Sequence, residues 1–292
     1  MNYGHTDILT GEKNGKYPHG NSMLVRGTEE TILVDPSISL IPRRDELPAV
    51  DRVVNSHCHE DHIAGNHLFP EVPWHLHELD HPGILSFAGL EDIYGYAEPI
   101  MAAFRPVLLR QFHFVARPDA LAYGDGAVFD LGGGVRVRAV HTPGHTRGHC
   151  CLYVEPDDVL YLGDIDLSSF GPYYGDAWSD LEDFERSLSA VRDIEARWYA
   201  TFHHIGVVDR RTFLDRLDRY TAVIADRERR LLEYLAEPHA IEDIVAHRFI
   251  YRPQDPVPFA DAVELRSMSQ HLDRLVRNGA VREVEPGRYT TP

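Results

Sequence analysis

The sequence has little cysteine and no long apolar run, and both absences narrow the class of protein. Its three cysteines, Cys58, Cys150 and Cys151, cannot form a disulfide framework, so we expect a reducing compartment, the cytoplasm. No apolar run approaches the roughly 20 residues of a membrane-spanning helix, which excludes a membrane partner. The residues after Met1 have neither the basic nor the apolar region of a secretory signal peptide.

Positive charge is also scarce. The formal net charge is −17, and lysine occurs only at positions 13 and 16. Proteins that bind nucleic acids usually neutralise phosphates with a basic surface, so we do not expect a nucleic-acid partner. We expect a small-molecule substrate instead. The 292 residues suffice for one large core and a smaller appendage.

Six consecutive residues, His57 to His62, contain four potential metal ligands in the pattern H-x-H-x-D-H. They follow the apolar pair Val53-Val54, which suits the end of a buried strand. Two histidines two residues apart project from one side of an extended chain, and Asp61 and His62 follow around a turn. Imidazole and carboxylate groups suit zinc, and also iron or manganese.

Further candidate ligands follow three other predicted strands. His145 stands on a Pro-Gly turn after residues 135–140, and Asp164 follows Leu160–Leu162. His203 and His204 end a strand that begins near residue 198. Because α/β folds place their chemistry in the loops at strand ends, we expect these groups to converge on one metal site.

Taken together, these motifs resemble those of the metallo-β-lactamase superfamily. The resemblance covers about residues 18–210. It includes an opening hairpin, Asn21–Val25 and Thr31–Asp35, although Pro36-Ser37 replaces the usual glycine-containing turn. The resemblance implies an α/β fold, an αββα sandwich of two mixed sheets with helices outside, and a binuclear metal site at one edge.

The resemblance also implies a ligand for each position. The first metal would take His57, His59 and His145; the second would take Asp61, His62 and a last histidine; Asp164 would bridge the two. Alternate strand residues face opposite sides, so only one of the adjacent pair His203 and His204 should reach the metal. We favour His204, because His203 then occupies a position that the family often gives to glycine, and keep His203 as the alternative.

Two divalent ions that share a water generate hydroxide near neutral pH. The expected cofactors are therefore two ions, zinc first and iron or manganese second. The expected reaction is attack by the bridging hydroxide on a small-molecule ester, thioester or lactone, with Asp61 and Asp164 as catalytic residues. The alternatives are a phosphodiesterase or endoribonuclease, and a mononuclear iron oxygenase of the same superfamily. The complete second ligand set argues against the oxygenase.

Two segments near the motifs could shape the substrate site. Residues 83–120 are rich in aromatics and proline and predict a helical insertion, either packed on the sheet or acting as a lid. Tyr173 and Tyr174 follow Asp164 in a glycine-containing loop, where they either contact substrate or pack. The histidines that follow the first motif, His67, His75, His77 and His81, are expected on exposed loop and helix surface.

The chain changes character near residue 209. We assign residues 1–208 to the catalytic domain and 209–292 to a small C-terminal domain of helices, followed by a hairpin around Glu285–Gly287. This order resembles the winged helix found after the catalytic domain in some relatives. Residues 226–292 contain ten arginines against twelve acidic residues, which favours packing or homodimer formation over DNA binding.

Overall fold

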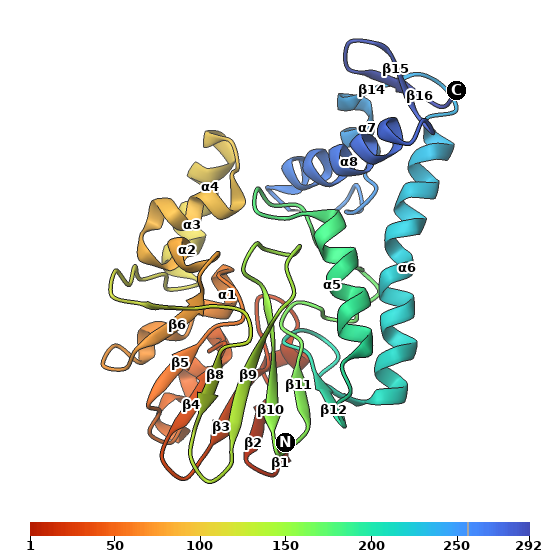
Figure 1. The fold of residues 1–292 in the computed structure, drawn as a ribbon. Helices are drawn as coiled ribbons and strands as arrows, with labels where there is room; N and C mark the ends of the chain where they lie inside the picture. Colours follow the sequence, from red (N-terminus) through yellow and green to blue (C-terminus); the bar gives the residue numbers. More distant parts are fainter. Residues whose placement is uncertain (256) are drawn as a thin grey trace.

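Two β-sheets form the centre of the protein in a computed structural model, which describes residues 1–255 and 257–292 (Figure 1). The first sheet contains seven strands that neighbour one another in chain order. The first three pairings are antiparallel and the last three are parallel, so the sheet is mixed. Its strands are β1 (Asn2–Tyr3), β2 (Thr6–Leu9), β3 (Ser22–Arg26), β4 (Thr31–Val34), β5 (Arg52–Val54), β6 (Trp74–His77) and β7 (Leu121–Tyr123).

The second sheet has six strands in the order β13-β12-β11-β10-β9-β8. Only the β11–β12 pair is parallel, because α5 (Leu181–Asp193) lies between these strands in the chain. The strands are β8 (Val128–Asp130), β9 (Arg136–His141), β10 (Cys150–Glu155), β11 (Val159–Tyr161), β12 (Trp198–Ala200) and β13 (Val207–Asp209).

Both faces of each sheet are covered, which gives four layers. Along β3, Met23 and Val25 pack between the sheets, and Leu24 packs on the outer face of the first sheet. This alternation follows from the two-residue period of a strand. On the outer face of the second sheet, Leu160 of β11 packs against Phe184 of α5. The αββα architecture with two mixed sheets is therefore as predicted.

Three helices fall within or beside the predicted insertion and cover the outer face of the first sheet. They are α2 (His81–Leu85), α3 (Phe87–Tyr94) and α4 (Glu98–Arg110), and an irregular stretch leads from α4 to β7. Two short helical segments, Ile38–Glu46 and Asn66–Leu68, and the one-turn helix α1 (Glu60–Ile63) join the strands of this sheet.

The C-terminal part begins with the long helix α6 (Arg210–Tyr234), which packs beside α5 on the second sheet and then extends beyond it (Figure 1). Its far end joins α7 (Ile241–His247), α8 (Ala260–Arg277) and a three-stranded sheet of β14 (His239–Ala240), β15 (Arg282–Glu285) and β16 (Arg288–Thr290). A separate core holds this unit together, and Leu231 of α6 contributes to it. Helices and a final hairpin are present as expected; the winged-helix assignment stays a prediction.

The expectation that His75 and His77 lie on the surface is wrong. They are 8% and 2% exposed, because both belong to β6 in the parallel part of the first sheet. The His77 ring stacks on His141 across the gap between the sheets, at 4.2 Å between ring centroids. No helix of the described residues is both long enough and apolar enough to cross a membrane.

Candidate metal centre

Loops at one edge of the two sheets carry the candidate ligands. The loop after β5 carries His57 and His59, and α1 carries Asp61 and His62. Three loops of the second sheet bring the others, which are His145 between β9 and β10, Asp164 after β11 and His203 after β12. All of these side chains except that of Asp164 are buried.

Three imidazoles and one carboxylate form the first group, which we call set one. Nε2 of His57 lies 3.0 Å from Nδ1 of His59, and Nε2 of His145 lies 2.9 Å from the same Nδ1. Oδ2 of Asp164 lies 3.2 Å from Nε2 of His145 and 3.9 Å from Nε2 of His57. One ion at the centre of these four atoms would be within reach of each.

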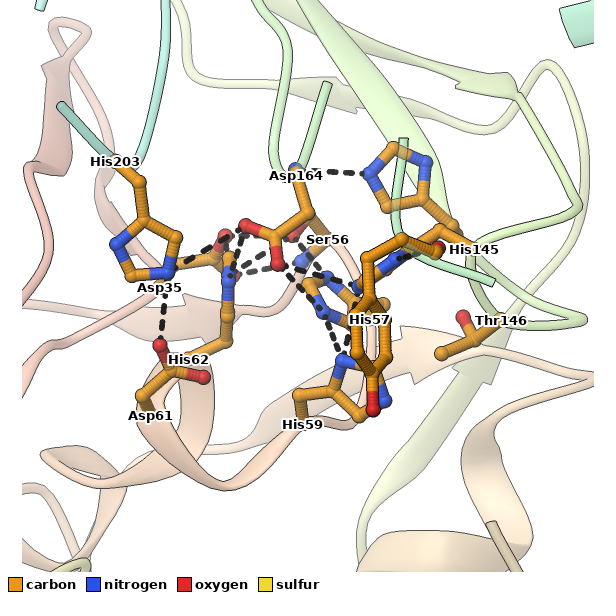
Figure 2. Close-up of polar contacts among 12 residues, drawn as sticks. Asp35, Ser56, His57, His59, Asp61, His62, His145, Thr146, Asp164 and His203 are labelled. Atoms are coloured by element: carbon orange, nitrogen blue, oxygen red, sulfur yellow. Dashed lines mark hydrogen bonds and ion pairs between the residues drawn. The ribbon is translucent and has the colours of Figure 1, made fainter. Parts of the chain in front are cut away.

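The second group, set two, consists of Asp61, His62 and His203. Oδ2 of Asp61 lies 2.9 Å from Nε2 of His203. Oδ1 of Asp164, the oxygen that does not face set one, lies 2.9 Å from Nε2 of His62 and 3.8 Å from Nε2 of His203. Figure 2 shows Asp164 between the two groups, in the position expected of a bridging carboxylate.

The structure corrects the choice of the last histidine: His203 joins set two and His204 does not. The prediction assumed that the strand continues to the histidines, but β12 ends at Ala200. The chain then turns, and His204 adopts a left-handed backbone conformation with φ of 57°. The alternation of a strand therefore no longer decides which ring faces the metal, and His204 lies half-buried at the wall of the cavity described below.

The ring nitrogens that face away from the centre are held by fixed acceptors. Nδ1 of His62 lies 2.8 Å from Oδ2 of Asp35, and Nδ1 of His57 lies 3.0 Å from Oγ of Ser56. The Ser56 hydroxyl donates to Oδ2 of Asp35 at 2.6 Å, so Ser56 Oγ accepts from His57. The Tyr161 hydroxyl also donates to Asp35. Asp35 thus orients one histidine in each set.

Backbone carbonyls hold two more rings. Nδ1 of His145 lies 2.9 Å from the carbonyl oxygen of Tyr173. Nδ1 of His203 lies 2.8 Å from the carbonyl of Gly15 and 3.0 Å from that of His19. A carbonyl can only accept, so both rings, when neutral, carry their proton on Nδ1 and turn an unprotonated Nε2 to the centre.

The fifth ring, His59, is reversed: Nε2 contacts a protein acceptor and Nδ1 faces the centre. Its Nε2 lies 3.0 Å from Oδ2 of Asp176, and its Nδ1 faces set one. The carboxylate of Asp176 is 1% exposed and also accepts from the hydroxyls of Tyr96 and Tyr173 through its other oxygen. In its neutral form, each imidazole therefore has one protonated nitrogen directed to the protein and one lone pair directed to the centre.

This arrangement fits metal ions. Lone pairs of three imidazoles within about 3 Å of one another repel unless a cation lies between them. In set two, Oδ2 of Asp61 is buried and has no hydrogen-bond donor among the described residues. The donor set of imidazole and carboxylate suits zinc, iron or manganese, and the geometry is consistent with a pair of divalent ions.

A buried carboxylate ties the ligand loops of the two sheets together. Asp80 accepts from the backbone N–H of Cys58 at 3.1 Å, between His57 and His59. It also accepts from the Thr146 hydroxyl and the Gly148 N–H, both at 2.6 Å, beside His145. The loops that carry set one are thus fixed relative to each other before any ion binds.

His149 orients the shared carboxylate from behind. Burial lowers the pKa of His149 to about 3, so its ring is neutral. Nδ1 contacts the Thr142 hydroxyl at 2.9 Å, and Nε2 accepts the backbone N–H of Asp164 at 3.1 Å. His149 therefore supports Asp164 without belonging to either set of candidate ligands.

The charge state of the shared carboxylate follows from its neighbours. Burial disfavours its ionised form, but the imidazoles of His62 and His203 more than offset burial and hold the pKa of Asp164 well below its usual range. Burial and the adjacent imidazoles of His62 and His59 together keep the pKa of His57 well below its usual range. The centre therefore offers an ionised carboxylate and, at His57, a neutral imidazole. Neighbouring carboxylates more than offset burial and raise the pKa of His59, His62 and His203, so an ion would have to displace a proton from these rings.

A cavity of about 390 Å³ opens onto both sets. Tyr173 lines it, with its ring edge-on to His59. Tyr174 does not: its side chain is 1% exposed, and its hydroxyl lies 2.9 Å from Nε2 of His271 in α8. Of the two tyrosines considered as substrate contacts, only Tyr173 is placed to act as one. A larger groove between α5, α6 and α8 includes none of the ligands.

The sequence reasoning missed several carboxylates that surround the site, among them Asp35, Glu60, Asp80 and Asp176. Asp35 ends a predicted strand and so carried a weak signal. Glu60 is 6% exposed and accepts from the hydroxyls of Tyr17 at 2.8 Å and Tyr94 at 2.5 Å. Neither Glu60 nor Asp176 belongs to a local pattern that would reveal its role.

Comparison with known proteins agrees with this fold. The sequence model of the metallo-beta-lactamase superfamily matches residues 17–222. The acyl-coenzyme A thioesterase MBLAC2 of Bos taurus is 27% identical over 163 residues, which cover 50% of this chain and 57% of that protein. An atrochrysone carboxyl ACP thioesterase of Aspergillus fumigatus is 27% identical over 200 residues, 65% of this chain and 51% of the relative. The chain thus spans little more than half the length of these relatives.

Solved structures show the same fold over a longer range. A metallo-beta-lactamase family protein from Thermus thermophilus has a TM-score of 0.72 and 25% identity, and the alignment covers 99% of both chains. A beta-lactamase domain protein from Burkholderia ambifaria has a TM-score of 0.65 and 21% identity over 94% of this chain and 87% of that one. With the family's sequence model matching most of the chain and its layered fold present, the chain belongs to the metallo-beta-lactamase superfamily.

Proposed function

We propose that this protein is a binuclear metal-dependent hydrolase that cleaves an ester or thioester bond in a small molecule. The observation that carries the proposal is the shared carboxylate: the two oxygens of Asp164 face two separate groups of donors, and both groups open onto one cavity. When bound, two divalent ions, zinc first among the candidates, would supply hydroxide near neutral pH and polarise the substrate carbonyl.

Residues of the chain would hold the ions, transfer a proton and shape the substrate site. Asp164 orients both sets, and Asp61 adds an ionised oxygen at the side of set two that faces the cavity. Asp61 is therefore also placed to accept or return a proton beside set two. Tyr173 lies against His59 and His145 and shapes the space above set one. Asp35 and Asp176 fix the ring tautomers.

Two relatives support the choice of bond. Both the bovine and the fungal protein are named thioesterases, one for acyl-coenzyme A and one for an acyl carrier protein. Their low identity and partial overlap do not carry a substrate over, so lactones stay in the candidate range. We also keep as proposals a cytoplasmic location, a homodimer and a winged-helix-like C-terminal unit.

The alternatives receive less support from the structure. Among the residues that line the cavity there is no lysine or arginine, which a phosphodiesterase or endoribonuclease would use to hold phosphates. A mononuclear iron oxygenase would need only one set, whereas set two brings three buried donors together. A hydrolase uses both sets.

Metal analysis and a substrate screen test the proposal together. The purified protein should hold about two ions per chain and hydrolyse thioesters or esters, and Asp164→Asn should lose both metal and turnover. Asp125→Asn serves as the control, because Asp125, in the turn between β7 and β8, accepts from the backbone N–H of His141 and contacts no candidate ligand. One iron per chain with oxygen consumption, or full activity in metal-free Asp164→Asn, would refute it.

A further inference from the structure

Resting on the proposed function, the geometry points to a substrate class: we propose that the substrate carries an uncharged, apolar group of about a dozen non-hydrogen atoms, and that the C-terminal unit forms part of the wall that selects it. The wall is aromatic and comes from two segments outside the two sheets. The C-terminal unit is thus part of the substrate site.

The first half of this wall belongs to the helical insertion, and the second half to the segment between α7 and α8. Tyr94, Tyr96 and Phe104 line the cavity from α3, the turn after it and α4. Phe259 lines it from the start of α8 and stacks on Tyr96, with ring centroids 5.6 Å apart and planes within 10°. Phe259 also contacts Phe104, at 5.5 Å between centroids. Tyr251 completes the wall from the C-terminal side.

Specific hydrogen bonds hold the C-terminal half in place. The carboxylate of Glu264 is fully buried and accepts from the backbone N–H groups of Phe249, Ile250 and Tyr251, at 2.8–2.9 Å. The Arg266 guanidinium in α8 donates to the carbonyls at the end of α3, at 3.3 and 3.0 Å. The two halves are therefore linked directly, and the wall does not depend on the metal ions for its shape.

A buried arginine holds the loop around Phe170, which also lines the cavity. Arg227 of α6 is 2% exposed and donates to the carbonyls of Phe170 and Pro172, at 2.8 and 2.6 Å. These residues lie in the loop that leads to Tyr173 and Asp176. Because the guanidinium already donates to these two backbone carbonyls, it is not available to bind an anionic substrate.

Two of the three tyrosine hydroxyls of the wall are already paired. The hydroxyls of Tyr94 and Tyr96 donate to Glu60 and Asp176, at 2.5 and 2.8 Å. No lysine or arginine lines the cavity, and its lining includes Glu60, Asp61, Asp164, Asp166 and Asp176. At the aromatic wall, which carries none of the candidate metal ligands, an anionic group would meet the Glu60 carboxylate with no lysine or arginine among the described lining residues, whereas an apolar group would meet the faces of aromatic rings.

The cavity volume limits the size of this group. A water molecule occupies about 30 Å³ in the liquid and a methylene group is of similar size, so about 390 Å³ accommodates about a dozen non-hydrogen atoms. Each methylene that leaves water for such a wall should raise kcat/KM about three- to fourfold until the cavity is full.

Two series of thioesters test the proposal. In one the acyl group grows from acetyl to octanoyl on a fixed small thiol, and in the other the thiol grows on a fixed acetyl group. One series should show kcat/KM rising about tenfold for two added methylenes. Succinyl, similar in size to butanoyl but anionic, should be cleaved more than tenfold more slowly than butanoyl.

In Phe259→Ala the increase in kcat/KM from the shortest to the longest substrate should be about tenfold smaller than in wild type, with metal content unchanged. Leu265→Ala is the matched control, because this side chain lies on the same helix and is 45% exposed. Thermal unfolding identifies a variant that has lost its fold. A second variant, Tyr251→Leu, keeps the volume and apolar character of the wall and should retain most of the dependence.

A binding experiment separates this inference from the proposed function. Calorimetric titration of wild-type protein with 1-octanol should show binding with a negative heat-capacity change, and Phe259→Ala should weaken it about tenfold. If no ester or thioester is cleaved but octanol binds in this way, the proposed function is wrong and the inference that the cavity binds an apolar group is supported. If thioesters are cleaved equally at every length, and octanol does not bind, the inference is wrong.

Discussion

Replacement of Asp176 by asparagine tests how the protein prepares His59 for metal. Burial lowers the pKa of His59, but the hydrogen bond and charge of Asp176 more than offset it and raise the pKa to about 9. The carboxylate accepts from Nε2, 3.0 Å away, and so turns Nδ1 to set one, where an ion would have to displace the second proton of the ring. An amide oxygen is a weaker acceptor, and an amide nitrogen in the same place would favour the wrong tautomer.

Loss of such an outer contact costs about 10- to 100-fold in metal affinity, or about 1.4–2.7 kcal/mol. We expect this loss at one of the two ions in Asp176→Asn, measured by titration against a chromophoric chelator. The amide oxygen can still accept from Tyr96, so the fold should persist. Asp166→Asn removes the same charge from the same cavity without contacting a ligand ring, and should change affinity less than threefold. Equal affinities in wild type and Asp176→Asn would refute the role of this contact.

Three further predictions concern the last ligand, a buried histidine and the buried arginine. His203→Ala should bind about one ion per chain by elemental analysis, whereas His204→Ala should keep both; the opposite result would restore the sequence-based choice. Burial, with a smaller contribution from Arg52, lowers the pKa of His75 to about 4, below the unfolded value of about 6.5. The native state therefore binds fewer protons, and this contribution to stability is present above pH 6.5 and lost as the pH falls toward 4. Urea unfolding of metal-free protein measures this contribution. Between pH 7 and pH 5 the free energy of unfolding should fall by up to about 2 kcal/mol less in His75→Phe than in wild type. Equal decreases in the two proteins would contradict the lowered pKa of His75. Arg227→Met should destabilise the protein by about 2 kcal/mol in the same assay and raise KM, because two buried carbonyls lose their donor; an unchanged KM would show that the loop does not need it.

The sequence predicted the parts of the site that are encoded locally. His57, His59, Asp61 and His62 lie within six residues, and the loop geometry after a strand brings them to one side. His145 and Asp164 could be added because each follows an apolar strand that ends at the same edge. The layered fold followed from the resemblance that these motifs carry.

The remaining parts depend on contacts between distant residues. Asp176 meets His59 across more than a hundred residues, and no pattern near either one records the contact. The choice of His203 depended on where β12 ends, and strand boundaries are the least certain part of any reading by pattern. The burial of His75 was missed because a histidine in a parallel strand looks like one in a surface loop.

The acceptors of His203 have a consequence for biosynthesis. The carbonyls of Gly15 and His19 leave the ribosome almost two hundred residues before the ring that they orient. Strand β12 must also pair with β11 before that ring can approach. A nascent chain that already contains Asp164 could therefore acquire the ion of set one, whereas set two closes only when the second sheet is nearly complete. The donors of set two are complete only in chains synthesised past His203, about forty residues after Asp164 completes set one.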